Sequence, residues 1–258
     1  MCSSDLPFYR WFGDGITNTC YNALDLHIER GLGEKIALIY DSPITGKKNK
    51  FTYLELKNLV SKFAGALKSL GINKSDRVII YMPMIPEAVV AMLACGRIGA
   101  IHSVDFGGFA ANELASRIDD SKAKIIVSAS CGFEPGRTVE YKPLLDKAIK
   151  ISKHKPEKII LFQRKNHEVK LNPPIEIDWE EAIKNVSPAE CVEMKASDYA
   201  YILYTSGTTG TPKGIVRDIG GHIVALKWTM KNIYNIKEND VWWSASDKIG
   251  RASCRERV

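Results

Sequence analysis

One short stretch of the sequence, YTSGTTGTPKG at positions 204–214, combines residue types that bind phosphate. It contains three glycines, four threonines, a serine and a lysine, and offers almost no apolar side chain for a core. Glycine-rich turns present backbone N–H groups in a concavity that suits an anion, and hydroxyl groups add further donors. The candidate phosphate-binding residues are Thr205, Ser206, Gly207, Thr208, Thr209, Gly210 and Lys213. Because Lys213 adds a positive charge on a flexible stem, the stretch predicts a polyphosphate site.

Two other interpretations of this stretch compete with phosphate binding. A Walker A loop, G-x-x-x-x-G-K-[ST], is excluded, because from Gly207 it requires glycine at Pro212 and serine or threonine at Gly214. A plain surface loop of turn-forming residues is the other alternative, although four threonines beside a Lys-Gly pair favour anion binding. Residues 200–204 are a short apolar run typical of a buried strand, and residues 223–228 have weakly helical spacing. We therefore expect a strand, the loop and then a helix.

Composition and charge exclude several classes of protein. Hydrophobic residues make up 45% and charged residues 26% of the 258 residues, which is ordinary for a globular protein. No apolar stretch approaches the roughly 18 residues that span a membrane, so membrane insertion is not expected. The net charge is +6, but residues 248–258 contain four basic residues and one acidic residue and so contribute +3 of it. The rest has no basic stripe interleaved with aromatic residues, so nucleic-acid binding is not expected.

The cysteines and the amino end bear on the compartment. The six cysteines are scattered without a C-x-x-C pair or a histidine partner, so they predict neither a metal site nor a disulfide framework. This pattern favours a reducing environment. The amino end has neither the apolar segment of a signal peptide nor the Arg-rich stretch of a transit peptide, so no targeting segment is visible. We expect the mitochondrial matrix or the cytoplasm.

Apolar runs that predict strands alternate with stretches that predict helices. Strands are expected at residues 35–40, 78–82, 100–104, 125–128 and 159–162, with helices at about 53–70, 87–98 and 144–152 and a turn-rich segment at 42–50. Thr52 and Glu55 form a capping box, Leu59 belongs to the expected apolar face, and Gly71 ends the first helix. This alternation favours parallel β-α-β units, so the predicted fold class is α/β.

Several stretches together resemble one enzyme family. TSGTTGTPKG resembles the phosphate loop of the adenylate-forming superfamily, which includes acyl-CoA synthetases, luciferases and adenylation domains of peptide synthetases. WFGDGITNTCYNALDLHIERG at 11–31, YMPMIPEAVVAMLACGRIGAIHSVDFGGF at 81–109, EPGR at 134–137 and VWWSASD at 241–247 are similar to acetyl- and propionyl-CoA synthetases, closest to the propionyl-CoA synthetase branch. The resemblance covers about residues 8–247. It implies the amino-terminal part of the large adenylate-forming domain, with parallel-rich sheets and flanking helices and without the carboxy-terminal lid domain.

The resemblance implies a two-step ligation. Enzymes of this family activate a carboxylate with ATP to an acyl-adenylate, release pyrophosphate, and let the thiol of CoA displace AMP. The implied substrates and partners are ATP with Mg²⁺, CoA and a short-chain carboxylate, propionate or acetate, with no tightly bound cofactor. Because a carboxylate is already an anion, the first step needs positioning and charge neutralisation rather than a base. Lys213 and Thr208 are the implied catalytic residues.

The resemblance also implies a CoA site. The motif Glu134, Pro135, Gly136 and Arg137 matches a segment that contacts the nucleotide end of CoA, and Gly108 lies in a turn near it. Arg137 offers phosphate a planar fork of donors, and Gly108 lets CoA approach the backbone. The alternatives are a surface salt bridge for Arg137 and a plain strand-to-helix turn at Gly108.

Other residues have types that suggest a role. His102 is expected to be a hydrogen-bonded core histidine rather than a base, and His222, near the phosphate loop, at most supports residues that touch a ligand. The pair Trp242 and Trp243 is expected to pack against other side chains rather than to line a substrate site. Asp105 stands where similar sequences carry an apolar residue, so we expect the geometry to differ there.

The resemblance divides the chain into three segments. Residues 1–30 are typical of acetyl- and propionyl-CoA synthetases, and residues 31–247 form part of an AMP-binding domain. Residues 248–258 are expected not to belong to the natural protein, because the resemblance stops abruptly after Asp247. The chain by itself is then expected to be inactive. The alternatives are a non-catalytic nucleotide- or CoA-binding truncated form and an adenylate-forming ligase for another carboxylic acid.

Overall fold

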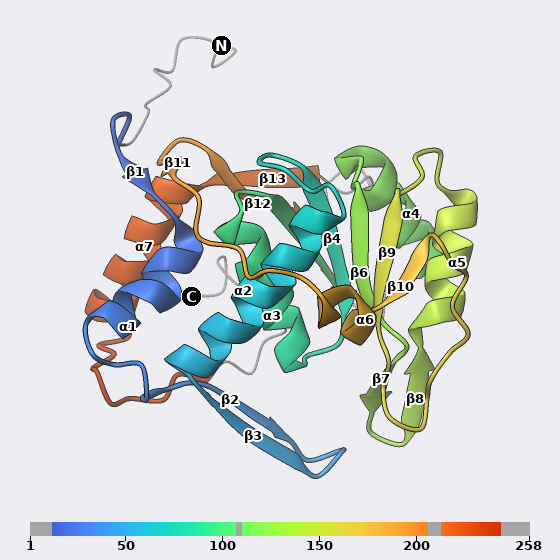
Figure 1. The fold of residues 1–258 in the computed structure, drawn as a ribbon, viewed down its shortest axis with the longest axis horizontal. Coiled ribbons are helices and arrows are strands. Elements are labelled where there is room, and N and C mark those ends of the chain that lie inside the picture. The colour runs from blue at the N-terminus through green and yellow to red at the C-terminus, as the bar shows by residue number, and fades with distance from the viewer. Residues whose placement is uncertain (1–11, 107–109, 206–212, 244–258) are drawn as a thin grey trace.

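The computed structural model describes residues 12–106, 110–205 and 213–243 as an α/β fold around a seven-stranded sheet (Figure 1). From edge to edge the strands are β10 (Glu176–Asp178), β9 (Lys158–Phe162), β6 (Ile125–Ala129), β4 (Arg77–Met82), β5 (Ile101–Phe106), β12 (Tyr199–Thr205) and β13 (Lys213–Asp218). The first six run parallel, and β13 runs antiparallel to β12. The predicted α/β class with a parallel-rich sheet is confirmed.

The middle strands are apolar because helices cover both faces of the sheet. All of β6 is buried, and so are residues 78–82 of β4. In the strand order, the chain moves from β4 to β5 in one direction across the sheet and from β5 to β6 in the opposite direction. Right-handed crossovers therefore place α3 (Pro86–Arg97) and α4 (Ala111–Ser121) on opposite faces. The helix α2 (Tyr53–Ser69) packs on α3, and α5 (Tyr141–Ile151) packs on α4. A sheet covered in this way needs continuous hydrophobic strands.

Helix α2 begins at the predicted capping box. Thr52 Oγ1 accepts a hydrogen bond from the Glu55 N–H at 3.1 Å, and Glu55 Oε2 accepts one from the Thr52 N–H at 2.8 Å. After the helix, Gly71 has a φ of +86°, a conformation that favours glycine. The expected apolar face is wrong at Leu59, which is 41% exposed. It lines a shallow surface hollow with Trp179 and Ile183 of α6 (Trp179–Lys184), so α6 covers this side of α2 only in part.

Two hairpins extend from the lower side of the molecule as drawn in Figure 1. One pairs β2 (Ile36–Ser42) with β3 (Lys47–Thr52), so the expectation of a turn over residues 42–50 is wrong. Residues 43–46 make the turn, and the polar residues that follow suit a strand of which most residues are exposed. The other hairpin pairs β7 (Cys131–Glu134) with β8 (Arg137–Glu140).

The amino-terminal part of the described chain contacts the segment that leads into β12. Here β1 (Ile16–Thr17) pairs with β11 (Met194–Lys195), and η1 (Tyr21–Asp25) and α1 (Leu26–Glu29) follow β1. The last described helix is α7 (Ile219–Asn232). Among the residues that the structure describes, no helix has both the length and the apolar character to cross a membrane.

Candidate functional site

The candidate phosphate-binding stretch connects two antiparallel strands. Thr205, the last residue of β12, lies opposite Lys213, the first residue of β13. The expected strand over residues 200–204 lies within β12, and the expected helix over residues 223–228 lies within α7. The strand β13 between the stretch and that helix was not predicted, although its Ile215 and Val216 favour a strand. The predicted residues Ser206, Gly207, Thr208, Thr209 and Gly210 lie outside the described residues.

The structure brings the two predicted ligand regions to the same edge of the sheet. β5 and β12 are neighbours and run parallel, with Tyr201 opposite His102 and Ile202 opposite Ser103. Their carboxyl ends, Phe106 and Thr205, therefore lie at the same edge, which is where α/β sheets bind ligands. Gly108 comes two residues after Phe106 and lies outside the described residues.

The EPGR motif forms the turn of the β7–β8 hairpin. Glu134 lies opposite Arg137, and Gly136 has a φ of +75°, so Pro135 and Gly136 provide a tight turn. Arg137 Nη2 and Nε donate to Glu134 Oε2 at 2.6 and 2.7 Å, and the Arg137 side chain is 70% exposed. In the free chain Arg137 thus makes the surface salt bridge that was the alternative interpretation. Because β7 begins two residues after β6 ends, the hairpin leaves the carboxyl edge of the sheet.

A polar cluster lies beside the end of β12. Tyr204 Oη donates to Asp120 Oδ2 at 2.6 Å, and the guanidinium carbon of Arg117 lies 5.5 Å from the centre of the Tyr204 ring. Burial and the hydrogen bond to Asp120 raise the pKa of Tyr204. Arg117 and Asp120 both belong to α4, so this contact joins that helix to the strand that ends at the candidate phosphate-binding stretch. None of these three residues was predicted from the sequence as part of a site, although Tyr204 directly precedes the TSGTTG motif.

Asp105 lies in the same cluster, on β5. Its carboxylate is 1% exposed, Oδ1 lies 3.5 Å from Arg117 Nε, and Ser103 Oγ donates to Oδ1 at 3.5 Å. Among the described residues Oδ2 accepts no hydrogen bond. Burial raises the pKa of Asp105 to about 7, and the Arg117 charge and the Ser103 hydrogen bond offset only part of that effect. An acidic side chain is therefore built into the sheet one residue before the end of β5.

The two histidines flank Tyr201. The rings of His102 and Tyr201 stack with centroids 5.6 Å apart, and the His222 ring meets Tyr201 edge-on at 4.9 Å. Tyr201 Oη and His222 Nδ1 are 3.4 Å apart. Burial, with a smaller effect of His222, lowers the pKa of His102 to about 4, so His102 is neutral at physiological pH. The expectation that His102 is fully hydrogen-bonded is wrong, because its buried Nδ1 has no partner among the described residues.

The paired tryptophans differ from each other. Trp242 contacts Tyr234, with ring centroids 4.4 Å apart, and it is 45% exposed. Trp243 is 80% exposed. The expected packing role therefore fits Trp242 in part and is wrong for Trp243.

Comparisons with known proteins agree with this arrangement. The sequence profile of a family described as "AMP-binding enzyme" matches residues 27–249. The chain is 55% identical over 242 residues to acyl-CoA synthetase short-chain family member 3, mitochondrial, of Homo sapiens, covering 93% of this chain and 35% of that protein. It is 44% identical over 246 residues to acetyl-coenzyme A synthetase of Pasteurella multocida (strain Pm70), covering 95% and 37%. The chain thus spans little more than a third of these relatives.

The fold is also found in a solved structure. Acetoacetyl-CoA synthetase from Streptomyces lividans matches with a TM-score of 0.81 at 24% identity, over 91% of this chain and 35% of that chain. At this identity the similarity concerns the fold.

Proposed function

Because the chain belongs to the AMP-binding enzyme family, we propose that it forms the phosphate- and CoA-binding part of an ATP-dependent acid–thiol ligase. The ligase joins a short-chain carboxylate to the thiol of CoA through an acyl-adenylate and releases AMP and pyrophosphate. Relatives named acyl-CoA and acetyl-coenzyme A synthetases support this proposal. The observation that carries it is the pairing of Thr205 with Lys213, which holds both ends of the phosphate-binding stretch together at the carboxyl edge of the sheet.

In the first step, a carboxylate oxygen attacks the α-phosphorus of ATP and pyrophosphate leaves. The substrate needs no base, so the protein contributes alignment and compensation of the phosphate charge. Lys213 is exposed at the start of β13 and supplies a positive charge for the leaving pyrophosphate. The hydroxyl group of Thr208 and the N–H groups of residues 205–210 supply hydrogen bonds. Mg²⁺ enters as part of the substrate, bound to the phosphate oxygens of ATP.

In the second step, the thiol of CoA attacks the acyl carbon and AMP leaves. The nucleotide end of CoA binds at the turn made by Glu134, Pro135, Gly136 and Arg137, with Gly108 nearby. Arg137 then exchanges the carboxylate of Glu134 for a CoA phosphate, a change that its exposure permits. The turn supports this role because Pro135 and Gly136 fix both side chains on one tip of the hairpin.

The acid is a short one, acetate or propionate. The resemblance to acetyl- and propionyl-CoA synthetases supports this choice, as does the relative of which the name says short-chain. The compartment is the mitochondrial matrix or the cytoplasm, and the relatives named mitochondrial favour the mitochondrion.

The test is carboxylate-dependent exchange between ATP and pyrophosphate. Residues 1–247 of this chain would be joined to the remaining length of the 55% identical human relative, to give a chimera of full family length. We expect exchange with acetate or propionate and thioester formation when CoA is added. A chimera that folds but exchanges only with an aromatic acid would contradict the short-chain ligase, and one that binds ATP without any exchange would favour a non-catalytic binding protein.

A further inference from the structure

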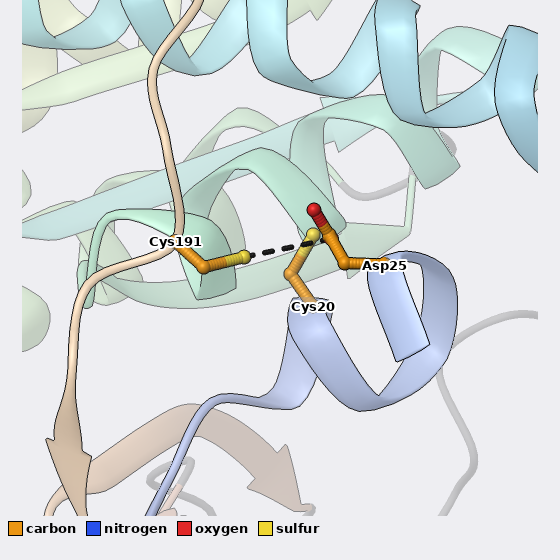
Figure 2. A group of neighbouring side chains, drawn as sticks. All are labelled: Cys20, Asp25 and Cys191. Atoms are coloured by element: carbon orange, nitrogen blue, oxygen red, sulfur yellow. Dashed lines mark hydrogen bonds between the residues drawn. The ribbon is translucent and has the colours of Figure 1, made fainter. Parts of the chain in front are cut away.

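Two cysteines that are far apart in the sequence meet in a buried cluster at the end of α3 (Figure 2). Cys20 directly precedes η1, Asp25 ends η1, and Cys191 lies in the segment before β11. The two sulfur atoms and a carboxylate oxygen of Asp25 all lie within 4.8 Å of one another. Cys20 is fully buried and Cys191 is half-buried, so solvent reaches the pair from the Cys191 side.

A buried arginine holds the three side chains together. Arg97 is 0% exposed, and its Nη1 donates to Asp25 Oδ2 at 2.7 Å, to Cys191 Sγ at 3.1 Å and to Cys20 Sγ at 3.5 Å. Its Nη2 donates to Asp25 Oδ1 at 3.0 Å and to Glu190 Oε2 at 3.2 Å. The site that a metal ion would take is thus already occupied by a guanidinium that contacts all three possible ligands. This arrangement disfavours a metal centre, because a second cation there would meet the charge of Arg97.

The same arrangement favours a thiolate. The hydrogen bond from Cys191 and the contact with Arg97 lower the pKa of Cys20, although burial and the Asp25 charge oppose this. The hydrogen bond to Cys20 and burial raise the pKa of Cys191. One proton is therefore held on Cys191, whose Sγ donates to Asp25 Oδ2 at 3.6 Å, and the charges that face the pair are those of Arg97, Asp25 and Glu190. A thiolate next to a second thiol is the arrangement that oxidants convert to a disulfide.

We propose that Cys20 and Cys191 form a disulfide when the protein meets a peroxide. The thiolate of the pair attacks a peroxide oxygen, the O–O bond breaks, and a sulfenic acid forms with release of hydroxide. The second sulfur then attacks the sulfenic sulfur, the S–O bond breaks, and water leaves as the S–S bond forms. In total two thiols are oxidised and one peroxide is reduced to two waters.

The disulfide would link two segments that already contact each other at the end of α3. Asn18 Nδ2 already donates to the carbonyl oxygens of Gly96, at 2.9 Å, and Val192, at 2.9 Å, and the Val192 N–H donates to the Arg97 carbonyl oxygen at 2.9 Å. A disulfide would add a covalent link between η1 and the segment that leads through β11 to β12. Since β12 ends at the phosphate-binding stretch, oxidation would fix the strand that carries it.

Peptide mapping by mass spectrometry, without reduction, tests the proposal. The full chain would carry Cys2→Ser and Cys254→Ser, which removes the two cysteines outside the described residues. After mild hydrogen peroxide treatment we expect one linked peptide pair, Cys20 with Cys191, and a melting temperature raised by on the order of 5 °C or more. Dithiothreitol should reverse both changes. The Cys191→Ser variant should lose the link, and Cys20 should then be oxidised to higher acids.

Cys95 provides the matched control, because it is a fully buried free cysteine of which burial raises the pKa to about 12. The Cys95→Ser variant should form the Cys20–Cys191 link as the parent does. Circular dichroism of each variant before oxidation would confirm that it is folded. Oxidation of Cys191 to sulfinic acid with Cys20 unchanged would overturn the proposal. So would protection of both thiols from alkylation by one equivalent of Zn²⁺, which would make the cluster a metal site.

Discussion

Thr205 and Lys213 lie directly opposite each other across β12 and β13, so the two ends of the candidate phosphate-binding stretch are held together by a strand pair. The backbone of Lys213 is fixed by this pairing, and its exposed side chain is free to reach a ligand at the edge of the sheet. This relationship makes Lys213 testable apart from the fold, because its side chain contributes little to packing.

We expect Lys213→Ala to reduce adenylate formation in the full-length chimera by about 10²–10³-fold, because one charge-assisted contact in the transition state is lost. ATP–pyrophosphate exchange measures this step, and the KM for CoA should change less. Lys50→Ala on β3 is the matched control, an exposed strand lysine away from the sheet edge that carries the loop. Full exchange activity in Lys213→Ala would mean that the stretch is a structural turn.

Arg137→Ala separates the two half-reactions. Loss of one phosphate contact should raise the KM for CoA by about tenfold to a hundredfold, while exchange in the absence of CoA stays close to that of the parent. The ion pair with Glu134 is exposed, so its loss should change the free energy of unfolding by at most about 1 kcal/mol.

Lys184→Ala is the control for Arg137→Ala, because Lys184 pairs with Glu181 at the same spacing of three residues and both side chains are more than 60% exposed. Its KM for CoA should equal that of the parent. Equal losses of exchange and of thioester formation in Arg137→Ala would show that the residue supports the fold rather than CoA.

Because the pKa of Asp105 is raised in the folded protein, we expect the stability of the fold to depend on pH. Its pKa is about 7 in the folded protein, above its ordinary value of 3.8, so the folded state binds the proton more tightly than the unfolded state. Stability should therefore fall as the pH rises from about 4 to about 7 and change little above that. Asp105→Asn should remove this slope and unfold with a free energy about 1–4 kcal/mol higher than the parent at pH 8, with little difference near pH 4.

Urea unfolding between pH 4.5 and 8 measures this slope. Glu113→Gln is the control, since Glu113 contacts the same Arg117 but its side chain is 50% exposed. We expect the slope of the parent to persist in that variant. An unchanged slope in Asp105→Asn would show that Asp105 is ionised throughout the range.

Local sequence determined much of the fold and less of the site. The capping box at Thr52 and Glu55 and the apolar strands at residues 78–82 and 125–128 were predicted because each rests on neighbours in the sequence or on continuous burial. The strand β13 was missed because KGIVRD has only two apolar residues and becomes a strand by pairing with β12. Pairing of this kind depends on the partner strand and leaves a weak mark in the sequence.

The candidate site depends more on long-range packing. Tyr204 and Asp120 are 84 residues apart and meet only because α4 crosses the face of the sheet beside β12. The periodicity of apolar residues does not predict that a carboxylate such as that of Asp105 is buried. The EPGR motif was found because a short turn carries its own signal, Pro before Gly, whatever surrounds it.

The last prediction concerns the exposed apolar surface around β13, an edge strand of the seven-stranded sheet. Val216 on this strand is 46% exposed, and Val224 and Trp228 on α7 are 47% and 58% exposed. A strand with one unpaired edge and exposed apolar side chains pairs readily with another chain, so we expect the 258-residue chain alone to self-associate. Light scattering after gel filtration should show association that increases with concentration.

The Val216→Lys variant should associate less, because a charge on an edge strand opposes pairing. Leu54→Lys, at a residue of α2 that is 39% exposed, should leave the association unchanged. A monomer at all concentrations would contradict the prediction.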